Sequence, residues 1–85
     1  MINLNRKKEI LEEALLAHSF CEQAAEGNHE ILLEYMEEVA NVNLDAAPHE
    51  LTYISRVCDF VIRMRDQGLF SHEIASEFQK AHFLN

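Results

Sequence analysis

The sequence has few of the residues that interrupt helices. Its 85 residues include two glycines and one proline, which leaves little material for the turns and irregular loops of a β-rich fold. Glutamate, leucine and alanine are the commonest residues, and all three favour helices. The apolar fraction of 48% is sufficient for one core. We therefore expect one all-α domain over residues 1–85.

The chain also has few cysteines and no long apolar run. Cys21 and Cys58 are too few for a disulfide framework and form no CxxC pair. We expect two buried thiols, although a bridge is possible if their helices pack side by side. No stretch approaches the roughly 20 apolar residues that span a bilayer, and the first residues do not resemble a secretory signal. The expectation is a cytoplasmic protein without a membrane segment.

Motifs of the common catalytic and nucleotide-binding sites are absent: there is no P-loop, GxGxxG, HExxH or GxSxG. Among the five histidines, His18 lies three residues before Cys21, but a closed zinc site needs four ligands. Glu26 and His29 match the Glu-x-x-His pattern of di-iron bundles, but Gly27 interrupts the helix there. We expect no enzyme activity, catalytic residue, cofactor or metal ligand, and a metal-binding domain is the lowest-ranked alternative.

Four segments have apolar residues at three- and four-residue intervals, which predicts helices over residues 4–26, 29–41, 48–67 and 71–82. Gly27 and Gly68 follow two of them, as is usual past a helix end. The connections are brief, which favours antiparallel neighbours. We expect a compact four-helix domain of antiparallel, up-and-down character with a short fourth helix. The expected starting residues are Asn3 or Asn5, Asn28, Pro48 and Ser71.

The predicted helix over residues 4–26 has one apolar stripe, while that over residues 48–67 is the most apolar and should lie at the centre of the core. Residues of the first stripe are spaced so that they share one side of the helix: Ile10, Leu11, Ala14, Leu15, His18, Cys21, Ala24 and Ala25.

Basic residues are missing from the middle of the chain. Residues 1–8 carry three bases and no acid, residues 9–50 carry eleven acids and no lysine or arginine, and residues 51–85 carry four of each. The acidity therefore lies in residues 9–50, and the net charge of −8 is what remains after the three bases of residues 1–8. A merely solvated helix usually mixes lysine with glutamate. High net charge for solubility is the competing explanation.

Several of these acids are neighbours on a helix surface. Pairs four residues apart, such as Glu9 with Glu13, destabilise an isolated helix by about 0.2–0.5 kcal/mol each. The sequence accepts this cost repeatedly, which favours a basic partner. The predicted partner-binding face consists of Glu9, Glu12, Glu13, Glu30, Glu34, Glu37 and Glu38.

The function that this composition predicts is that of a small acidic protein-binding module or inhibitor that engages a basic surface of a partner protein. In composition it is comparable to immunity proteins, antitoxins and phage inhibitors, and a nucleic-acid mimic is a special case. Direct nucleic-acid binding is not expected, because phosphate neutralisation needs clustered bases and the only clusters are residues 6–8 and Arg56, Arg63 and Arg65.

The end of the chain predicts self-association. Large side chains gather there, at Phe78, His82, Phe83 and Leu84. They either fold back on the core or pack on a second copy, and small amphipathic chains often dimerise to bury such surface. We expect a homodimer through these four residues. The alternative function is a structural or assembly protein that acts as a helical homodimer without a separate ligand.

Overall fold

Four α-helices and one short 3-10 helix form the protein. The computed structural model describes residues 1–83, with side chains through residue 81. The helices are α1 (Leu4–Ala25), α2 (His29–Asn43), the 3-10 helix η1 (Pro48–Glu50), α3 (Leu51–Asp66) and α4 (Ser71–Phe83). Residues 1–83 contain no strand. The predicted all-α fold with a short fourth helix is confirmed.

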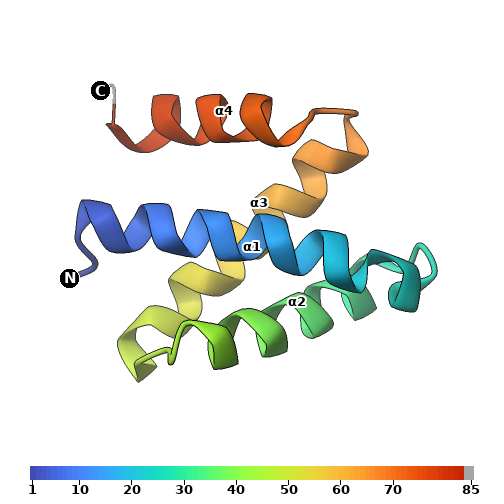
Figure 1. Cartoon of the computed structure of the whole chain (residues 1–85), viewed down its shortest axis with the longest axis horizontal. Helices are drawn as coiled ribbons and strands as arrows, with labels where there is room; N and C mark the ends of the chain where they lie inside the picture. The colour runs from blue at the N-terminus through green and yellow to red at the C-terminus, as the bar shows by residue number, and fades with distance from the viewer. Residues whose placement is uncertain (84–85) are drawn as a thin grey trace.

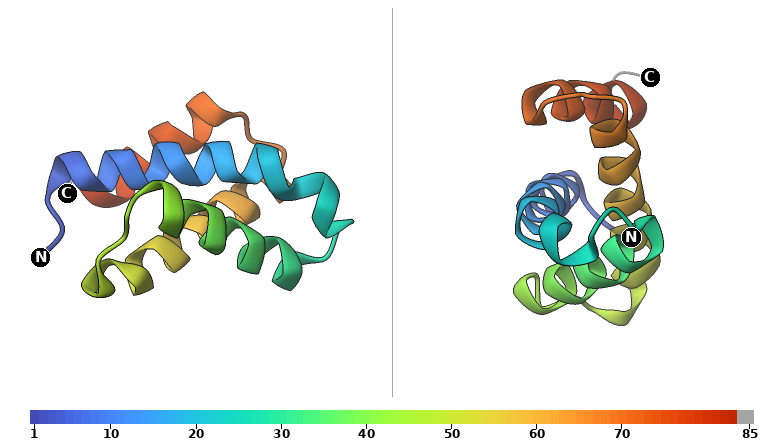
Figure 2. Two further views of the ribbon diagram at one scale, coloured as in Figure 1. Left: turned by 60° about the horizontal axis from the view of Figure 1, so that its bottom comes forward. Right: turned by 90° about the vertical axis from the view of Figure 1, so that its right-hand side faces the viewer.

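The first two helices form an antiparallel pair, and the third crosses behind both at an oblique angle (Figure 1). Helices α1, α2 and α3 pack together, whereas α4 packs on α3. The end-on view in Figure 2 shows α3 extending from the level of α2 to that of α4, so α1 lies between α2 and α4. No helix within the described part of the chain has both the length and the apolar character needed to cross a membrane.

Small and large side chains alternate in the core. Ala14 of α1 and Ala40 of α2 are fully buried, and their small size lets the helix axes approach closely. Met36 and Ile10 fill the remaining space and are also fully buried. Cys58 lies among them on α3 with no exposed surface, so the most apolar predicted helix does reach the centre of the core.

The helix ends follow the local signals in most places. The side chains of Asn3 and Asn28 accept hydrogen bonds from the backbone N–H groups of Arg6 (2.8 Å) and Ile31 (3.0 Å), and so cap α1 and α2. Gly68 ends α3 with a left-handed φ of 87°, and the N–H of Leu69 bonds to the carbonyl of Met64 in a Schellman arrangement.

Three ends differ from the prediction. Residues 48–50 form the 3-10 helix η1, so the third α-helix begins at Leu51 and not at Pro48. Ser71 does not cap α4 but is its first helical residue; its hydroxyl accepts a hydrogen bond from Arg65 at 2.6 Å. At this end the N–H of Phe70 instead donates a hydrogen bond to the Glu73 carboxylate at 2.8 Å. Helix α2 continues to Asn43 and ends through Asp45, which takes a left-handed φ of 50° although no glycine marks the position.

One ion pair joins parts of the chain that are far apart in sequence. Arg6 at the start of α1 donates to both carboxylate oxygens of Glu50, at 2.8 and 3.0 Å, and to the backbone carbonyl of Leu44 at 2.7 Å. The second carboxylate oxygen also accepts the N–H of Ala47. This network holds the connection between α2 and α3 against α1, and these hydrogen bonds lower the pKa of Glu50 to about 2.

Candidate functional site

The acids of α2 lie on two sides of the helix. Glu30, Glu34 and Glu38 are exposed and recur every four residues, so they form one row along the surface. Glu37 is half-buried on the side toward α3. Burial raises the pKa of the Cys58 thiol to about 12, and the nearby Glu37 carboxylate contributes to this. Three of these carboxylates share one surface hollow, which is lined by Glu34, Tyr35, Glu37, Glu38 and Asn41.

The acids of α1 divide in a similar way. Glu9 and Glu12 are exposed, and a carboxylate oxygen of Glu9 lies 3.7 Å from the Arg6 guanidinium. Glu13 is half-buried and faces α2. The seven predicted residues therefore do not form one continuous face. The structure brings Glu13 and Glu38 to the same groove, and the other five lie outside its lining: Glu9, Glu12, Glu30, Glu34 and Glu37.

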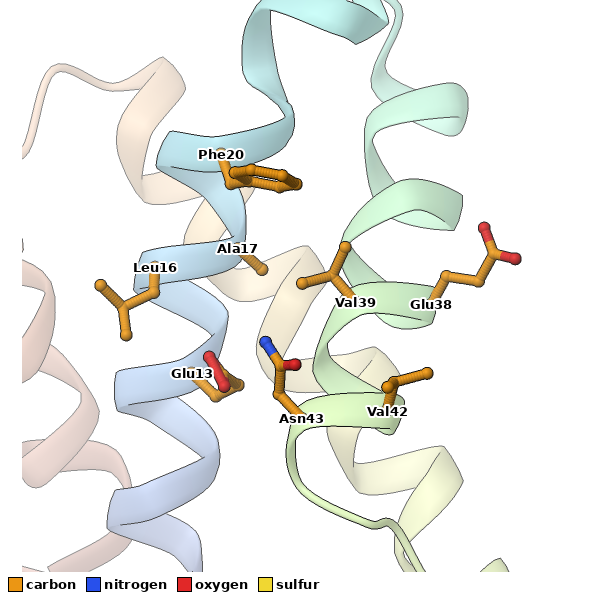
Figure 3. Close-up of a pocket in the computed structure, with 8 residues that line it drawn as sticks. All are labelled: Glu13, Leu16, Ala17, Phe20, Glu38, Val39, Val42 and Asn43. Carbon is orange, nitrogen blue, oxygen red and sulfur yellow. The ribbon is translucent and has the colours of Figure 1, made fainter.

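A groove of about 750 Å³ runs between α1 and α2 (Figure 3). Its floor contains Ala17, which is buried, and Val39, which is half-buried. Three large apolar side chains stand around this floor with most of their surface exposed: Leu16 (67%), Phe20 (79%) and Val42 (78%). Figure 3 shows the Phe20 ring extending from α1 toward α2. We call this feature the α1–α2 groove; its lining is Glu13, Leu16, Ala17, Phe20, Glu38, Val39, Val42 and Asn43.

A second hollow adjoins the groove beyond the Phe20 ring of α1 and extends toward the start of α2. This smaller hollow shares Phe20, Glu38 and Val39 with the α1–α2 groove and adds Tyr35, which is 40% exposed. Of the nine large apolar side chains that are exposed within the described residues, four line these two adjoining hollows. These four side chains therefore share one apolar surface on one side of the α1–α2 pair, while the other five line neither hollow.

This groove is the feature that sequence reasoning missed. Leu16 and Phe20 lie outside the predicted stripe of α1, but they are four residues apart and so share a second face of the helix. Tyr35, Val39 and Val42 have the same four- and three-residue spacing on α2. This second apolar row on each helix is the feature of the sequence that could have predicted the groove. Within the predicted stripe, Ala24 is exposed, and Ala17 beneath the groove is buried instead.

Charge at the groove has one sign. Glu13 stands on the α1 wall and Glu38 on the α2 wall. Neither these two nor Glu34 and Glu37 form an ion pair with another described residue. Arg6, the nearest preceding arginine in the sequence, is bound to Glu50. Residues 9–50 contain no lysine or arginine, so the lysine and arginine side chains of these two helices are confined to Arg6, Lys7 and Lys8 at the start of α1.

Histidine and cysteine chemistry lies elsewhere. His18 is buried in the α1 stripe, burial lowers its pKa, and its Nδ1 lies 3.4 Å from the Glu22 carboxylate. Both cysteines are buried free thiols. His29 contacts Asp59 of α3 at 3.0 Å. Nowhere in residues 1–81 do three histidine, cysteine, aspartate or glutamate side chains gather in a way that could hold a metal ion.

The predicted self-association residues are only partly described. Phe78 is 2% exposed and packs with Phe60 of α3, their ring centroids 6.1 Å apart. It therefore belongs to the core of its own chain. The side chains of His82 and Phe83 and the whole of Leu84 lie outside the described residues. Self-association through this end of the chain stays a prediction.

Comparisons with known proteins add no relative: no protein-family model, no curated protein and no solved structure matches the chain.

Proposed function

We propose that the protein is an acidic protein-binding module or inhibitor, and that it engages a basic surface of a partner protein through α1 and α2. The observation that carries the proposal is the coincidence of two features on one side of the molecule. Acids without a basic neighbour border an exposed apolar groove. Concentrated exposed apolar surface marks interaction sites in soluble proteins.

Each feature supplies a different part of binding. The apolar side chains supply affinity, because burying one large side chain is worth about 1.5–3 kcal/mol. The carboxylates steer a basic partner toward the groove and disfavour acidic competitors. The apolar groove favours a protein partner over mimicry of a nucleic acid, because a mimic of the phosphate backbone presents charge rather than exposed phenylalanine and leucine.

The first experiment compares two triple variants of equal charge change. Glu30, Glu34 and Glu38 are replaced by glutamine in one variant. In the control, Glu22, Glu26 and Glu77 are replaced; these are also exposed but belong neither to the row of acids along α2 nor to the groove lining. The partner is captured from the native cell, purified, and titrated against each variant at low and moderate salt.

We expect the first triple variant to bind more weakly and to lose most of the salt dependence, and we expect the control to bind as the unmodified protein does. Equal binding by both variants would show that the acids of α2 serve solubility alone.

A homodimer through the end of the chain is a separate prediction. Light scattering of the full chain with and without Phe83→Ala tests it, since that replacement leaves the buried Phe78 unchanged.

A further inference from the structure

The α1–α2 groove has the dimensions of a site for a helix. From Glu13 to Phe20 the groove follows α1 over eight residues, which is a rise of seven steps, and from Tyr35 to Asn43 it follows α2 over nine residues, a rise of eight steps. At 1.5 Å per residue, each wall is about 10–12 Å long, or about two helical turns. The walls are antiparallel helices, so the groove runs along their axes (Figures 1 and 3).

The backbone of the walls restricts what can bind. Both walls are helical throughout the groove, so their N–H and C=O groups are already bonded to each other. An extended segment cannot add to them as a strand adds to a sheet edge, and its own backbone groups would be buried against apolar side chains without partners. A helix satisfies its backbone internally and can present one apolar face to Leu16, Phe20 and Val42.

The charge on the walls defines the flanks of that helix. Glu13 points from α1 toward α2, whereas Glu38 extends from α2 on the side away from α1 (Figure 3), with Glu34 one turn from Glu38. Lysine and arginine have long side chains, so a partner helix with bases on both sides of its apolar stripe can reach Glu13 from one side and Glu38 from the other. A helix with bases on one side only leaves one wall unmatched.

The same charges disfavour a second copy of this chain. Two copies that meet groove to groove bring Glu13 and Glu38 of one copy against the same acids of the other. No lysine or arginine occurs in residues 9–50 to separate them, and each chain carries a net charge of −8. Like charges placed opposite each other across an interface oppose association.

We propose that the α1–α2 groove binds an amphipathic helix of a partner protein, with apolar residues at i, i+3 or i+4, and i+7, and with basic residues on both flanks of that stripe. This inference rests on the proposed function, because it names the element of the basic partner that enters the site. Phe20 and Val42 contact the apolar stripe, and Glu13 and Glu38 contact the two basic flanks.

The test uses synthetic peptides of about three turns. One peptide has leucine at the stripe positions and lysine on both flanks. A second keeps the lysines but has alanine for leucine, and a third keeps the leucines but has glutamate for lysine. Each is titrated into the full-length protein labelled with ¹⁵N, and amide shifts and affinity are recorded. We expect the leucine–lysine peptide to bind more tightly than either of the others, with the largest shifts in residues 13–20 and 35–43.

Variants of the protein separate the groove from the charge. The double replacement Phe20→Ser with Val42→Ser should weaken binding of the leucine–lysine peptide at least about tenfold, since each buried side chain is worth more than the 1.4 kcal/mol that makes a factor of ten. Phe70→Ser is the matched control, because Phe70 is 67% exposed but lies between α3 and α4. It should change the affinity less than twofold. All three positions are exposed, so the fold tolerates the changes.

The outcomes distinguish this inference from the proposed function. Suppose that Phe20→Ser with Val42→Ser leaves the affinity unchanged, while replacing Glu13, Glu34 and Glu38 by glutamine weakens it. The proposed helix-binding site is then wrong, but the proposed acidic binding surface is retained. If the glutamine replacements have no effect on either lysine peptide, the proposed function fails as well. If sedimentation shows a dimer that Phe20→Ser dissociates, a second copy occupies the groove, and the inference is overturned.

Discussion

Replacing Glu50 with glutamine should destabilise the protein measurably, although Glu50 is remote from the proposed site. The carboxyl pKa falls from 4.5 to about 2 in the folded chain, chiefly because Arg6 donates to it. A shift of that size contributes about 3 kcal/mol at neutral pH. The Arg6 side chain is 23% exposed, so solvent screens the ion pair. The expected contribution to the free energy of unfolding is therefore about 2 kcal/mol.

The assay is thermal and urea unfolding at pH 7, followed by circular dichroism. For a domain of this size, a loss of about 2 kcal/mol lowers Tm by roughly 8–16 °C. Glu12→Gln is the matched control, since Glu12 is exposed, and it should change the free energy of unfolding by less than about 0.5 kcal/mol.

Acid titration tests the cause of the effect. The folded pKa of Glu50 is depressed, so its stabilisation is fully present above the ordinary value of 4.5 and is lost as the pH falls toward 2. The difference in unfolding free energy between the original protein and Glu50→Gln should therefore shrink between pH 5 and pH 2. Equal stabilities at pH 7, or a difference that persists undiminished at pH 2, would refute the assignment of this ion pair.

Three further predictions concern the core and the helix ends. Met36→Ala should lower the free energy of unfolding by about 2–5 kcal/mol in urea titrations, because Met36 is completely buried. Asn28→Ala should cost about 1 kcal/mol in the same assay through loss of the α2 cap, and Asn43→Ala at the far end should cost less. A thiol reagent at pH 8 should label Cys58 only when urea unfolds the chain, because burial keeps its pKa near 12; rapid labelling of the folded protein would contradict this.

Local features of the fold could be predicted because their causes are local. An asparagine at position 28 caps a helix through an atom three residues from its partner, and Gly68 permits a left-handed backbone wherever it stands. Asp45 shows the limit of such reasoning, since it takes the same conformation without the residue type that usually announces it.

Features that depend on tertiary contacts could not be predicted from the sequence. Arg6 and Glu50 are 44 residues apart, and each alone is one charge among many. Likewise, Leu16 and Phe20 line a groove only because Val39 and Val42 lie on the neighbouring helix. Composition alone located the acidic segment. Which of its acids line the groove and which lie outside it depends on how α1 packs on α2.

The α1–α2 groove is the proposed contact surface for a basic partner protein. Methyl cross-saturation in the complex with the captured partner measures this most directly, because only methyl groups at the interface lose signal when the partner is irradiated. We expect the strongest losses at Leu16, Val39 and Val42, and no loss at Ile74 in the buried face of α4. Losses confined to methyl groups of α3 and α4, with Leu16 and Val42 unchanged, would contradict it.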